Sequence, residues 1–368
     1  MLNYYNPVKI IKTENWLYEL NKSIKNLKIS APIIVTTPGN RKRLSLDSKF
    51  DPQSIFSDVG SNPNFEDCIN VIEFCQNNIF DGVVALGGGS AMDLAKIVLA
   101  HLSLGKSDII ELIEYKEPFP KKTIPSIFLP TTHGTASEVT MWGTIWNMDE
   151  KKKYSISHPD LYPTVAILDG NLTLSLPLDI SITTVMDALS HSFESIWNKN
   201  ANDTSTNFAI TAICAILKNG EALKANPSNL TIRKKLLNAA TTAGLAFSNT
   251  TTAAAHSMSY PLTIHYGIPH GIASSISLLP LLEINGKFIK GPIDRICNNL
   301  ELTYDELKQT IKEIPRGVVP YSLDKWGITE DQLPKLADES FTKGRMDNNI
   351  VDLSTNDVLG ILKELYSD

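Results

Sequence analysis

The sequence changes character near residue 175, and this change limits the possible fold more than any other feature. Up to about residue 170, short runs rich in β-branched residues are separated by stretches with helical patterns. The runs are Pro32–Thr37, Gly82–Leu86, Ile124–Leu129 and Thr164–Asp169. Strands that alternate with helices are typical of βα units in a mostly parallel sheet. We therefore predict an α/β domain over residues 1–175.

The rest of the chain has a helical pattern. After Pro177 the β-rich runs give way to long stretches rich in Ala, Ser and Leu. The clearest are Ser205–Lys218, Ile232–Ser248 and Asn356–Tyr366. We predict an all-α second domain over residues 176–368, and a chain of 368 residues is long enough for two cores.

The composition argues against several classes of protein. The net charge is −6, and the compact basic runs at 41–43 and 151–153 form no stripe along which a nucleic acid could bind. No segment approaches a membrane span. The cysteines lack CxxC spacing and the first residues lack an apolar signal core. We therefore expect a cytoplasmic protein with reduced thiols, without a nucleic-acid partner and without membrane association.

One aspartate and three histidines in the helical half could bind a metal. Asp187 and His191 are four residues apart, so on a helix their side chains lie on the same face. His256 and His270 enclose the segment HSMSYPLTIHYGIPH. One oxygen and three nitrogen ligands suit Fe(II) or Zn(II) better than calcium. Any one of these residues alone is more often an ordinary core or surface residue, so the prediction rests on the set.

Glycines that follow a predicted strand indicate a phosphate site. The segment GVVALGGGSAMDLAK runs from a strand through Gly87, Gly88, Gly89 and Ser90 into a helix. Glycines allow a ligand to approach the backbone closely, and N–H groups at a helix N-terminus attract a pyrophosphate. The spacing GxGxxG is absent, so a plain tight turn is the alternative. Asp93 is either an acid on the helix face or a contact to the cofactor.

A second polar turn follows the next predicted strand. It has the sequence PTTHGT and covers residues 130–135. In open α/β sheets ligands bind beyond the carboxyl ends of the strands. Two such turns at one edge of the sheet favour a nucleotide site.

Four motifs in this order and spacing resemble the iron-containing (group III) alcohol dehydrogenase family. They are GGGSAMDLAK, PTTHGTASEVT, MDALSHSFES and HSMSYP followed by PHG. The resemblance runs from about Val35 to Tyr366. It implies a dinucleotide-binding domain, a helical metal-binding domain and an active site in the cleft between them. It also implies a metal, Fe(II) or Zn(II), with the ligands Asp187, His191, His256 and His270, and a cofactor that is NADH or NADPH.

The resemblance also implies a set of cofactor contacts. These are Asn62, Gly87, Gly88, Gly89, Ser90, Asp93, Thr131, Thr132, Thr140 and Lys153. Thr37 ends the first predicted strand, where the family often has an aspartate that binds the adenosine ribose. Without that charge, and with Arg41 and Arg43 nearby, we predict that NADPH is used at least as well as NADH. The alternative is that both arginines are solvated loop residues.

Three residues depart from the family pattern or could be mistaken for part of it. Tyr260 stands where many members have a histidine proposed to relay protons, and with an ordinary pKa of about 10 it is a poorer relay at neutral pH. His133 replaces a usual alanine in the second turn, and it faces either a ligand or solvent. His265 does not match the spacing of the ligands, so we interpret it as a surface residue or as one that supports a ligand.

The segment KKKYSISHPDLYP resembles the hydroxyethylphosphonate dehydrogenase (phosphonoacetaldehyde reductase) branch of the family. This implies a role in phosphonate biosynthesis, in which phosphonoacetaldehyde is reduced to 2-hydroxyethylphosphonate. An anionic aldehyde needs positive charge or N–H donors in its pocket. The candidate substrate contacts are His133, His158 and Arg316. Lys153 is already assigned to the cofactor, and Lys151 and Lys152 could equally form a solvated face.

Three other functions remain open. A general short-chain alcohol dehydrogenase of the same family would prefer neutral aldehydes. A dehydroquinate synthase-like lyase has the same two-domain design with NAD and a metal, but it shows no net turnover of NAD(P)H. A binding or scaffolding protein would require a vestigial ligand set, whereas all four positions hold competent ligands. We expect the protein to be a homo-oligomer, most simply a dimer.

Overall fold

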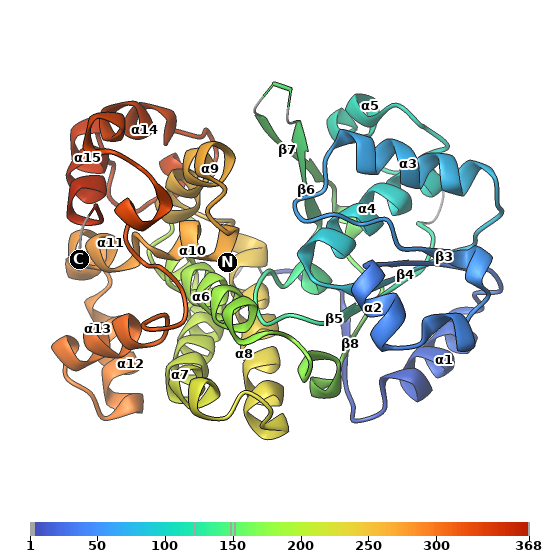
Figure 1. The fold of residues 1–368 in the computed structure, drawn as a ribbon, viewed down its shortest axis with the longest axis horizontal. Helices are drawn as coiled ribbons and strands as arrows, with labels where there is room; N and C mark the ends of the chain where they lie inside the picture. The colour runs from blue at the N-terminus through green and yellow to red at the C-terminus, as the bar shows by residue number, and fades with distance from the viewer. Residues whose placement is uncertain (1–3, 121–122, 148, 151, 367–368) are drawn as a thin grey trace. The chain divides into compact units, whose positions relative to one another are not determined.

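The computed structural model describes residues 4–120, 123–147, 149–150 and 152–366. These residues form two compact units (Figure 1). The α/β unit contains Asn6–Thr132 and Ala136–Thr173, and the helical unit contains residues 174–366 together with His133–Thr135 and residues 4–5. The division at Leu174 lies close to the boundary predicted from the sequence. No sequence pattern predicts that residues 133–135 pack with the helical unit.

The α/β unit is built on a six-stranded parallel sheet with the strand order β1-β8-β5-β4-β2-β3. The strands are β1 Lys9–Lys12, β2 Pro32–Thr36, β3 Ile55–Phe56, β4 Gly82–Gly87, β5 Ser126–Pro130 and β8 Val165–Leu168. All four predicted strands are present, so the predicted parallel α/β fold is confirmed. The edge strands β1 and β3 are too short to produce a clear sequence pattern.

Both faces of the central strands are buried. Ile33 and Val35 in β2 belong to one hydrophobic core, whereas Ile34 between them belongs to a second core on the other face. The helices of this unit are α1 Trp16–Leu27, α2 Pro38–Arg43, α3 Phe65–Gln76, α4 Gly89–Leu104 and α5 Ile109–Glu114. Burial on both faces explains why these strands are continuous apolar runs rather than alternating ones.

An antiparallel hairpin extends the α/β unit. Its strands are β6 Trp142–Asn147 and β7 Lys152–Ser157, in which Trp146 pairs with Lys153. The side chain of Lys152 is 67% exposed, which agrees with a solvated face for this residue. Lys151 lies outside the described residues.

The second unit is helical, as predicted. Its helices are α6 Leu178–Ile196, α7 Asp203–Ala225, α8 Leu230–Thr250, α9 Ala254–Tyr266, α10 His270–Ser275, α11 Leu278–Asn285, α12 Lys290–Leu300, α13 Tyr304–Glu313, α14 Leu333–Glu339 and α15 Thr355–Glu364. Short 3-10 helices also occur in the chain. They are η1 Leu46–Ser48, η2 Pro52–Ser54, η3 Ser137–Val139, η4 Pro159–Leu161, η5 Gly170–Thr173, η6 Gly286–Phe288, η7 Asp324–Trp326, η8 Glu330–Gln332 and η9 Met346–Asn348.

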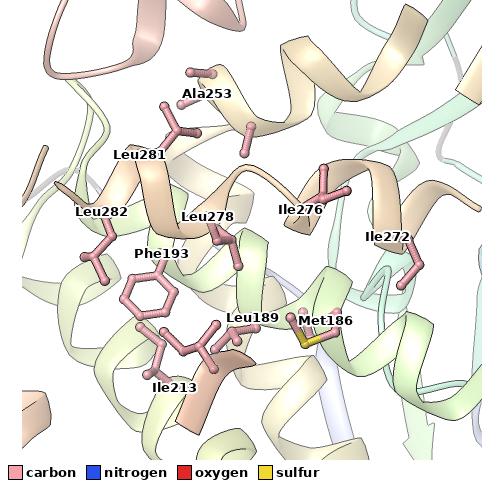
Figure 2. Packing of buried hydrophobic residues seen from close by; sticks show 14 of the residues in the cluster. Met186, Leu189, Phe193, Ile213, Ala253, Ile272, Ile276, Leu278, Leu281 and Leu282 are labelled. Carbon is pink, nitrogen blue, oxygen red and sulfur yellow. The ribbon is translucent and has the colours of Figure 1, made fainter. Parts of the chain in front are cut away.

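Helix α6 is the centre of the helical unit. Every residue from Val185 to Ile196 is buried, because α7, α8 and α10 all pack against this helix. Figure 2 shows Met186, Leu189 and Phe193 among apolar side chains from the neighbouring helices. Polar residues in this part of α6 are therefore removed from water and need partners inside the protein.

Within the described residues, no single helix has the length and apolar character that crossing a membrane would require. One pair, His270–Phe288 and Lys290–Leu300, passes by length and composition only when its two parts are taken together, and these are bent by 115°.

Candidate functional site

Three predicted metal ligands meet in a cluster within the helical unit. Asp187 comes from α6, His256 from the first turn of α9 and His270 from the first residue of α10. Asp187 Oδ1 lies 3.6 Å from His256 Nε2 and 3.8 Å from His270 Nε2. One potential ligand atom from each residue lies within 4.8 Å of the others. The helical fold thus brings together residues that are far apart in the sequence.

The fourth predicted ligand, His191, lies beside this group. Its Nδ1 is 4.0 Å from Asp187 Oδ2. Its ring stacks on Phe247 with a centroid distance of 4.0 Å and on His256 with a centroid distance of 4.5 Å. The stacking fixes the plane of the His191 ring next to the other three residues.

The donor atoms fit a divalent metal. Metal bonds of about 2.0–2.2 Å to nitrogen and oxygen place the ligands of one ion about 3–4 Å apart. The measured separations around Asp187 Oδ1 fall in this range. His256 Nε2 is buried, has no hydrogen-bond partner among the described residues and is too far from Asp187 for a hydrogen bond. Because an unsatisfied buried nitrogen is costly, a bound metal would stabilise this arrangement.

The electrostatics of the cluster favour positive charge. Burial alone would raise the pKa of Asp187, but the neighbouring histidines, His191 foremost, hold that pKa well below its usual range. Burial lowers the pKa of His256, yet Glu194 and Asp187 outweigh this effect and raise it to about 9. The cluster therefore attracts either protons or a metal cation.

Two side chains outside the predicted ligand set support these ligands. The Ser274 hydroxyl donates to Asp187 Oδ1 at 3.0 Å. Glu194 accepts from the backbone N–H of His256 at 3.0 Å, and its other oxygen lies 2.5 Å from His256 Nδ1. Glu194 stands seven residues after Asp187, which is two turns along the same face of α6. That spacing is the signal by which Glu194 could have been found.

The structure also shows the environments of His265 and Tyr260. His265 Nε2 lies 2.8 Å from the Glu339 carboxylate in a partly exposed pair, so it belongs to the surface, which is one of its two predicted positions. Tyr260 is partly buried, one turn after His256 on α9. Its role as a proton relay stays a prediction.

The predicted cofactor residues of the two turns lie together at the carboxyl edge of the parallel sheet. Gly87 at the end of β4 pairs with Pro130 at the end of β5. The backbone N–H of Thr131 donates to the Gly87 carbonyl at 2.9 Å. A Cβ atom on Gly88 would come within 2.9 Å of Thr132 Cγ2. The close approach of the second turn therefore requires glycine at this position.

The N-terminus of α4 has the form expected of a phosphate site. Gly88 caps this helix, and it offers no side chain to bond the first N–H groups. Gly89 and Ser90 form the first turn. Asn62 has a φ of 56°, and its backbone N–H donates to Ser90 Oγ at 3.3 Å. The 61–63 turn thus lies next to the glycine turn.

Lys153 lies close to the same turn. Its ammonium group is 5.9 Å from the ring centroid of Trp146, the residue with which it pairs across the hairpin. The backbone N–H of Trp146 donates to the carbonyl of Pro63 at 2.9 Å. The hairpin therefore brings Lys153 near the 61–63 turn.

Thr37 has a local structural role in addition to its predicted one. Its hydroxyl caps α2 by accepting from the backbone N–H of Asn40 at 3.2 Å. Arg41 forms an ion pair with Asp47 at 2.6 Å, and Arg43 donates to the carbonyl of Leu172 at 2.8 Å. Both guanidinium groups thus have protein partners, which weakens the argument that they would bind a 2′-phosphate.

A buried lysine for which no role was predicted from the sequence binds the segment that follows the second turn. The Lys96 ammonium donates to Ser137 Oγ at 2.8 Å, to Thr140 Oγ1 at 3.0 Å and to the Trp142 carbonyl at 2.5 Å. Burial lowers its pKa to about 8, although Asp93 and Glu138 oppose this shift. A lysine within a buried helix face, three residues after an acid, is the pattern that could have revealed it.

Asp93 belongs to the same network. One of its oxygens accepts from the Ser137 hydroxyl at 2.8 Å, and the other accepts from the backbone N–H of Thr144 at 2.9 Å. Asp93 and Thr140, which were predicted to contact the cofactor, therefore hold the 137–144 segment against α4.

Two of the three predicted substrate contacts are already used within the protein. His158 is buried, with Nδ1 accepting from the backbone N–H of Asp160 at 3.1 Å and Nε2 lying 3.0 Å from the carbonyl of Glu117. Arg316 is 73% exposed and pairs with Glu313 at the end of α13, which packs against α7 and α12. Both side chains thus have partners within the protein, and their assignment to substrate binding stays a prediction.

His133 has a different environment. It is fully buried, so the alternative of a solvent-facing loop residue is wrong. Neither ring nitrogen has a hydrogen-bond partner among the described residues. Its backbone N–H donates to the hydroxyl of Thr184, one turn before Asp187 on α6, at 3.3 Å. Burial, and to a smaller extent Arg233, lowers its pKa to about 3, so the ring is neutral.

Arg233 is a buried cation that the sequence did not reveal. Its side chain, in α8, is 1% exposed. It donates to the carbonyl oxygens of Pro227 and Leu176 and to the hydroxyl of Ser181. Its effect on the pKa of His133 indicates a positive electrostatic potential around that ring.

Comparison with known proteins gives consistent matches in both units. The model of the iron-containing alcohol dehydrogenases matches residues 7–170, and that of the C-terminal region of the Fe-containing alcohol dehydrogenase family matches residues 181–366. The chain is 30% identical over 360 residues to long-chain-alcohol dehydrogenase 1 of Geobacillus thermodenitrificans strain NG80-2, which covers 90% of this chain and 88% of that protein.

Two further matches are sulfoacetaldehyde reductases. The sulfoacetaldehyde reductase of Bilophila wadsworthia strain 3_1_6 is 26% identical over 369 residues and covers 94% of each chain. The crystal structure of the sulfoacetaldehyde reductase from Bifidobacterium kashiwanohense in complex with NAD+ superimposes with a TM-score of 0.86. It is 30% identical and covers 100% of this chain and 99% of that one.

Replacing His256 by alanine tests the metal cluster. We expect His256→Ala to lower bound metal, measured by elemental analysis, and to lower turnover at least about 100-fold, because partners that only support a ligand already cost 10–100-fold. The fold should persist by circular dichroism, because the surrounding core is apolar. His265→Ala is the matched control, and it should retain metal and activity. Wild-type turnover by a thoroughly chelated, metal-free protein would contradict the assignment.

Replacing Lys96 by methionine tests the network that holds the 137–142 segment. The substitution keeps the side-chain volume but leaves Ser137, Thr140 and the Trp142 carbonyl without their donor. We expect the free energy of unfolding to fall by about 3 kcal/mol and the Kd for NAD(P)H to rise, as measured by urea unfolding and fluorescence titration. Lys106→Met, which removes an exposed ion pair with Glu111, should change stability by about 0.5 kcal/mol or less. Equal effects of both substitutions would show that the network does not support the 137–142 segment.

Proposed function

Because the chain belongs to the iron-containing alcohol dehydrogenase family, we propose that this oxidoreductase uses NAD(P)H to reduce a short aldehyde with an anionic head group. The specific substrate that we propose is phosphonoacetaldehyde, and the product is 2-hydroxyethylphosphonate. The observation that carries the reaction type is the cluster of Asp187, His256 and His270 within this family fold. The matches of both units to alcohol dehydrogenases argue against the lyase alternative.

The residues of the cluster fit this chemistry. A divalent metal held by them, with His191 beside it, would supply a Lewis acid that polarises the aldehyde carbonyl, while the nicotinamide supplies the hydride. Ser274 and Glu194 hold two of the ligands in place. Burial of Asp187 and His256 excludes water, which strengthens electrostatic interactions at the site. Tyr260 on α9 is the proposed proton donor.

Support for an anionic head group comes from His133. Its ring nitrogens are buried without a hydrogen-bond partner among the described residues, and they lie in the field of Arg233. A neutral imidazole has one N–H to donate, and an anionic oxygen is a strong acceptor for it. The sulfoacetaldehyde reductases to which the chain is similar are named for an aldehyde with a sulfonate group. The KKKYSISHPDLYP resemblance favours a phosphonate instead.

The order of substrates tests this proposal. We expect the wild-type enzyme to have a higher kcat/KM for phosphonoacetaldehyde than for sulfoacetaldehyde, propanal or butyraldehyde. The assay follows NAD(P)H oxidation with metal-loaded enzyme. A preference for sulfoacetaldehyde would retain the anionic class but overturn the phosphonate. A preference for propanal or butyraldehyde would leave only a general alcohol dehydrogenase.

The same assay tests His133. We expect His133→Ala to lower kcat/KM for phosphonoacetaldehyde by about tenfold or more, because a hydrogen bond to a charged group contributes about 1.5–3 kcal/mol. Activity on propanal should scarcely change. The fold should tolerate the substitution, because alanine is the usual residue of the family at this place. An equal loss on both substrates would contradict a contact to the head group.

Coenzyme choice depends on the end of β2. We infer that NADPH serves at least as well as NADH, because Thr37 places no carboxylate against a 2′-phosphate. Thr37→Asp should therefore shift kcat/KM toward NADH, whereas Thr37→Asn, of similar size but uncharged, should not. Because Arg41 and Arg43 have protein partners, this prediction does not depend on them. It depends on the lack of a carboxylate at position 37 that would repel the 2′-phosphate. A clear preference of the wild-type enzyme for NADH would overturn it.

A further inference from the structure

We propose that Glu194 is a positioning residue that fixes the orientation and the tautomer of His256 and so determines how tightly the site binds its metal. The proposal rests on the metal site of the proposed function but not on any particular substrate. Glu194 lies in α6 with 0% of its surface exposed. It touches His256 rather than the reacting atoms, so its influence passes through the ligand.

The Glu194 carboxylate contacts His256 through both of its oxygens. One oxygen accepts from the backbone N–H at 3.0 Å, and the other lies 2.5 Å from the ring Nδ1. Holding the backbone and the ring from one planar group restricts the side-chain dihedrals of His256. The stacked ring of His191 closes another side of the imidazole at a centroid distance of 4.5 Å. The His256 ring is therefore fixed before a metal binds.

The carboxylate also selects the tautomer. An ionised carboxylate only accepts hydrogen bonds, so Nδ1 must carry the proton. The lone pair of the neutral ring is then on Nε2, the nitrogen that lies 3.6 Å from Asp187 Oδ1. A histidine that was free to flip or to protonate Nε2 would not present this lone pair to the cluster. Outer partners of this kind raise the basicity of the ligand and fix its orientation.

Helix α6 makes the arrangement rigid. Asp187 and Glu194 lie two turns apart on the same helix, and His256 from α9 stands against both. The helix thus supplies one ligand directly and holds a second one through Glu194. The two carboxylates also bring two negative charges close to an ion with two positive charges. This balance favours a divalent over a monovalent cation.

The test is Glu194→Gln in the full-length protein. The amide oxygen of glutamine can accept from only one of the two His256 donors, while its NH₂ group faces the other donor. We expect the Kd for Zn²⁺, measured by competition with a chromogenic chelator, to rise about 10–100-fold. Glu339→Gln is the matched control, because Glu339 pairs with the non-ligand His265 at 2.8 Å in the same unit. That variant should bind Zn²⁺ with the wild-type Kd.

A spectroscopic readout separates positioning from mere stability. With Co²⁺ in place of the native metal, the visible absorption bands should shift in Glu194→Gln and stay unchanged in Glu339→Gln. In the Zn²⁺ protein with ¹⁵N-labelled histidine, the His256 signal should show a protonated Nδ1 in the wild type and lose that signature in Glu194→Gln. A variant that only unfolds more easily, with an unchanged Kd and unchanged spectra, would overturn the proposal.

A second variant covers the case in which Glu194→Gln does not fold. Glu194→Asp keeps the charge but withdraws the carboxylate by one methylene, so it should bind Zn²⁺ more weakly than the wild type. An unchanged Kd in this variant would also contradict the proposal. These results are independent of the substrate assignment, since no aldehyde is present. If His256→Ala loses metal while both Glu194 variants retain it, the metal site stands and only the role of Glu194 fails.

Discussion

The burial of charged and polar groups on α6 is the constraint on which the helical unit depends. A helix enclosed on all sides would ordinarily be apolar, and an unpaired buried carboxylate is very costly. Asp187 and Glu194 are nevertheless 2% and 0% exposed. The groups that satisfy them come from other helices, His256 from α9 and Ser274 from α10. The apolar core and the polar site therefore depend on each other, because the packing that buries the carboxylates also delivers their partners.

The α/β unit also contains a buried charged group, which in this case is a cation. Helix α4 is almost completely buried, and it carries Lys96. This cation is stabilised by Asp93 nearby and by hydroxyl and carbonyl groups of the 137–142 segment. The same helix begins at the glycine turn. Its N-terminus can face a phosphate, while its middle holds the 137–142 segment that follows the second turn.

The sequence predicted those features whose signal is local or periodic. The central strands stand out because both faces are buried, and the ligand set stands out because its motifs are unusual. The partners of a buried polar side chain often lie far away in the sequence. The remaining features of the site could therefore not be predicted from the sequence. The roles of Glu194, Lys96 and Arg233 were not predicted, because these roles depend on residues that are distant in the sequence, although Glu194 and Lys96 lie within two of the quoted motifs. His158 shows the converse case, because the sequence of a distinctive segment does not reveal that the ring of this histidine contacts the backbone of Asp160 and the carbonyl of Glu117.

Recognition of an anionic head group through a neutral histidine has a kinetic rationale. The head group is remote from the carbonyl and has the same charge in the aldehyde and in the alcohol. A strong ion pair would therefore bind substrate and product equally, which lowers KM without raising kcat. In the proposed function, a single N–H from His133, near the positive charge of the buried Arg233, would select the anion and bind it more weakly than an ion pair would. Because Arg233 is already bonded to Pro227, Leu176 and Ser181, it contributes potential without becoming a direct ligand. A site of the proposed kind would favour charged aldehydes and still release the charged product.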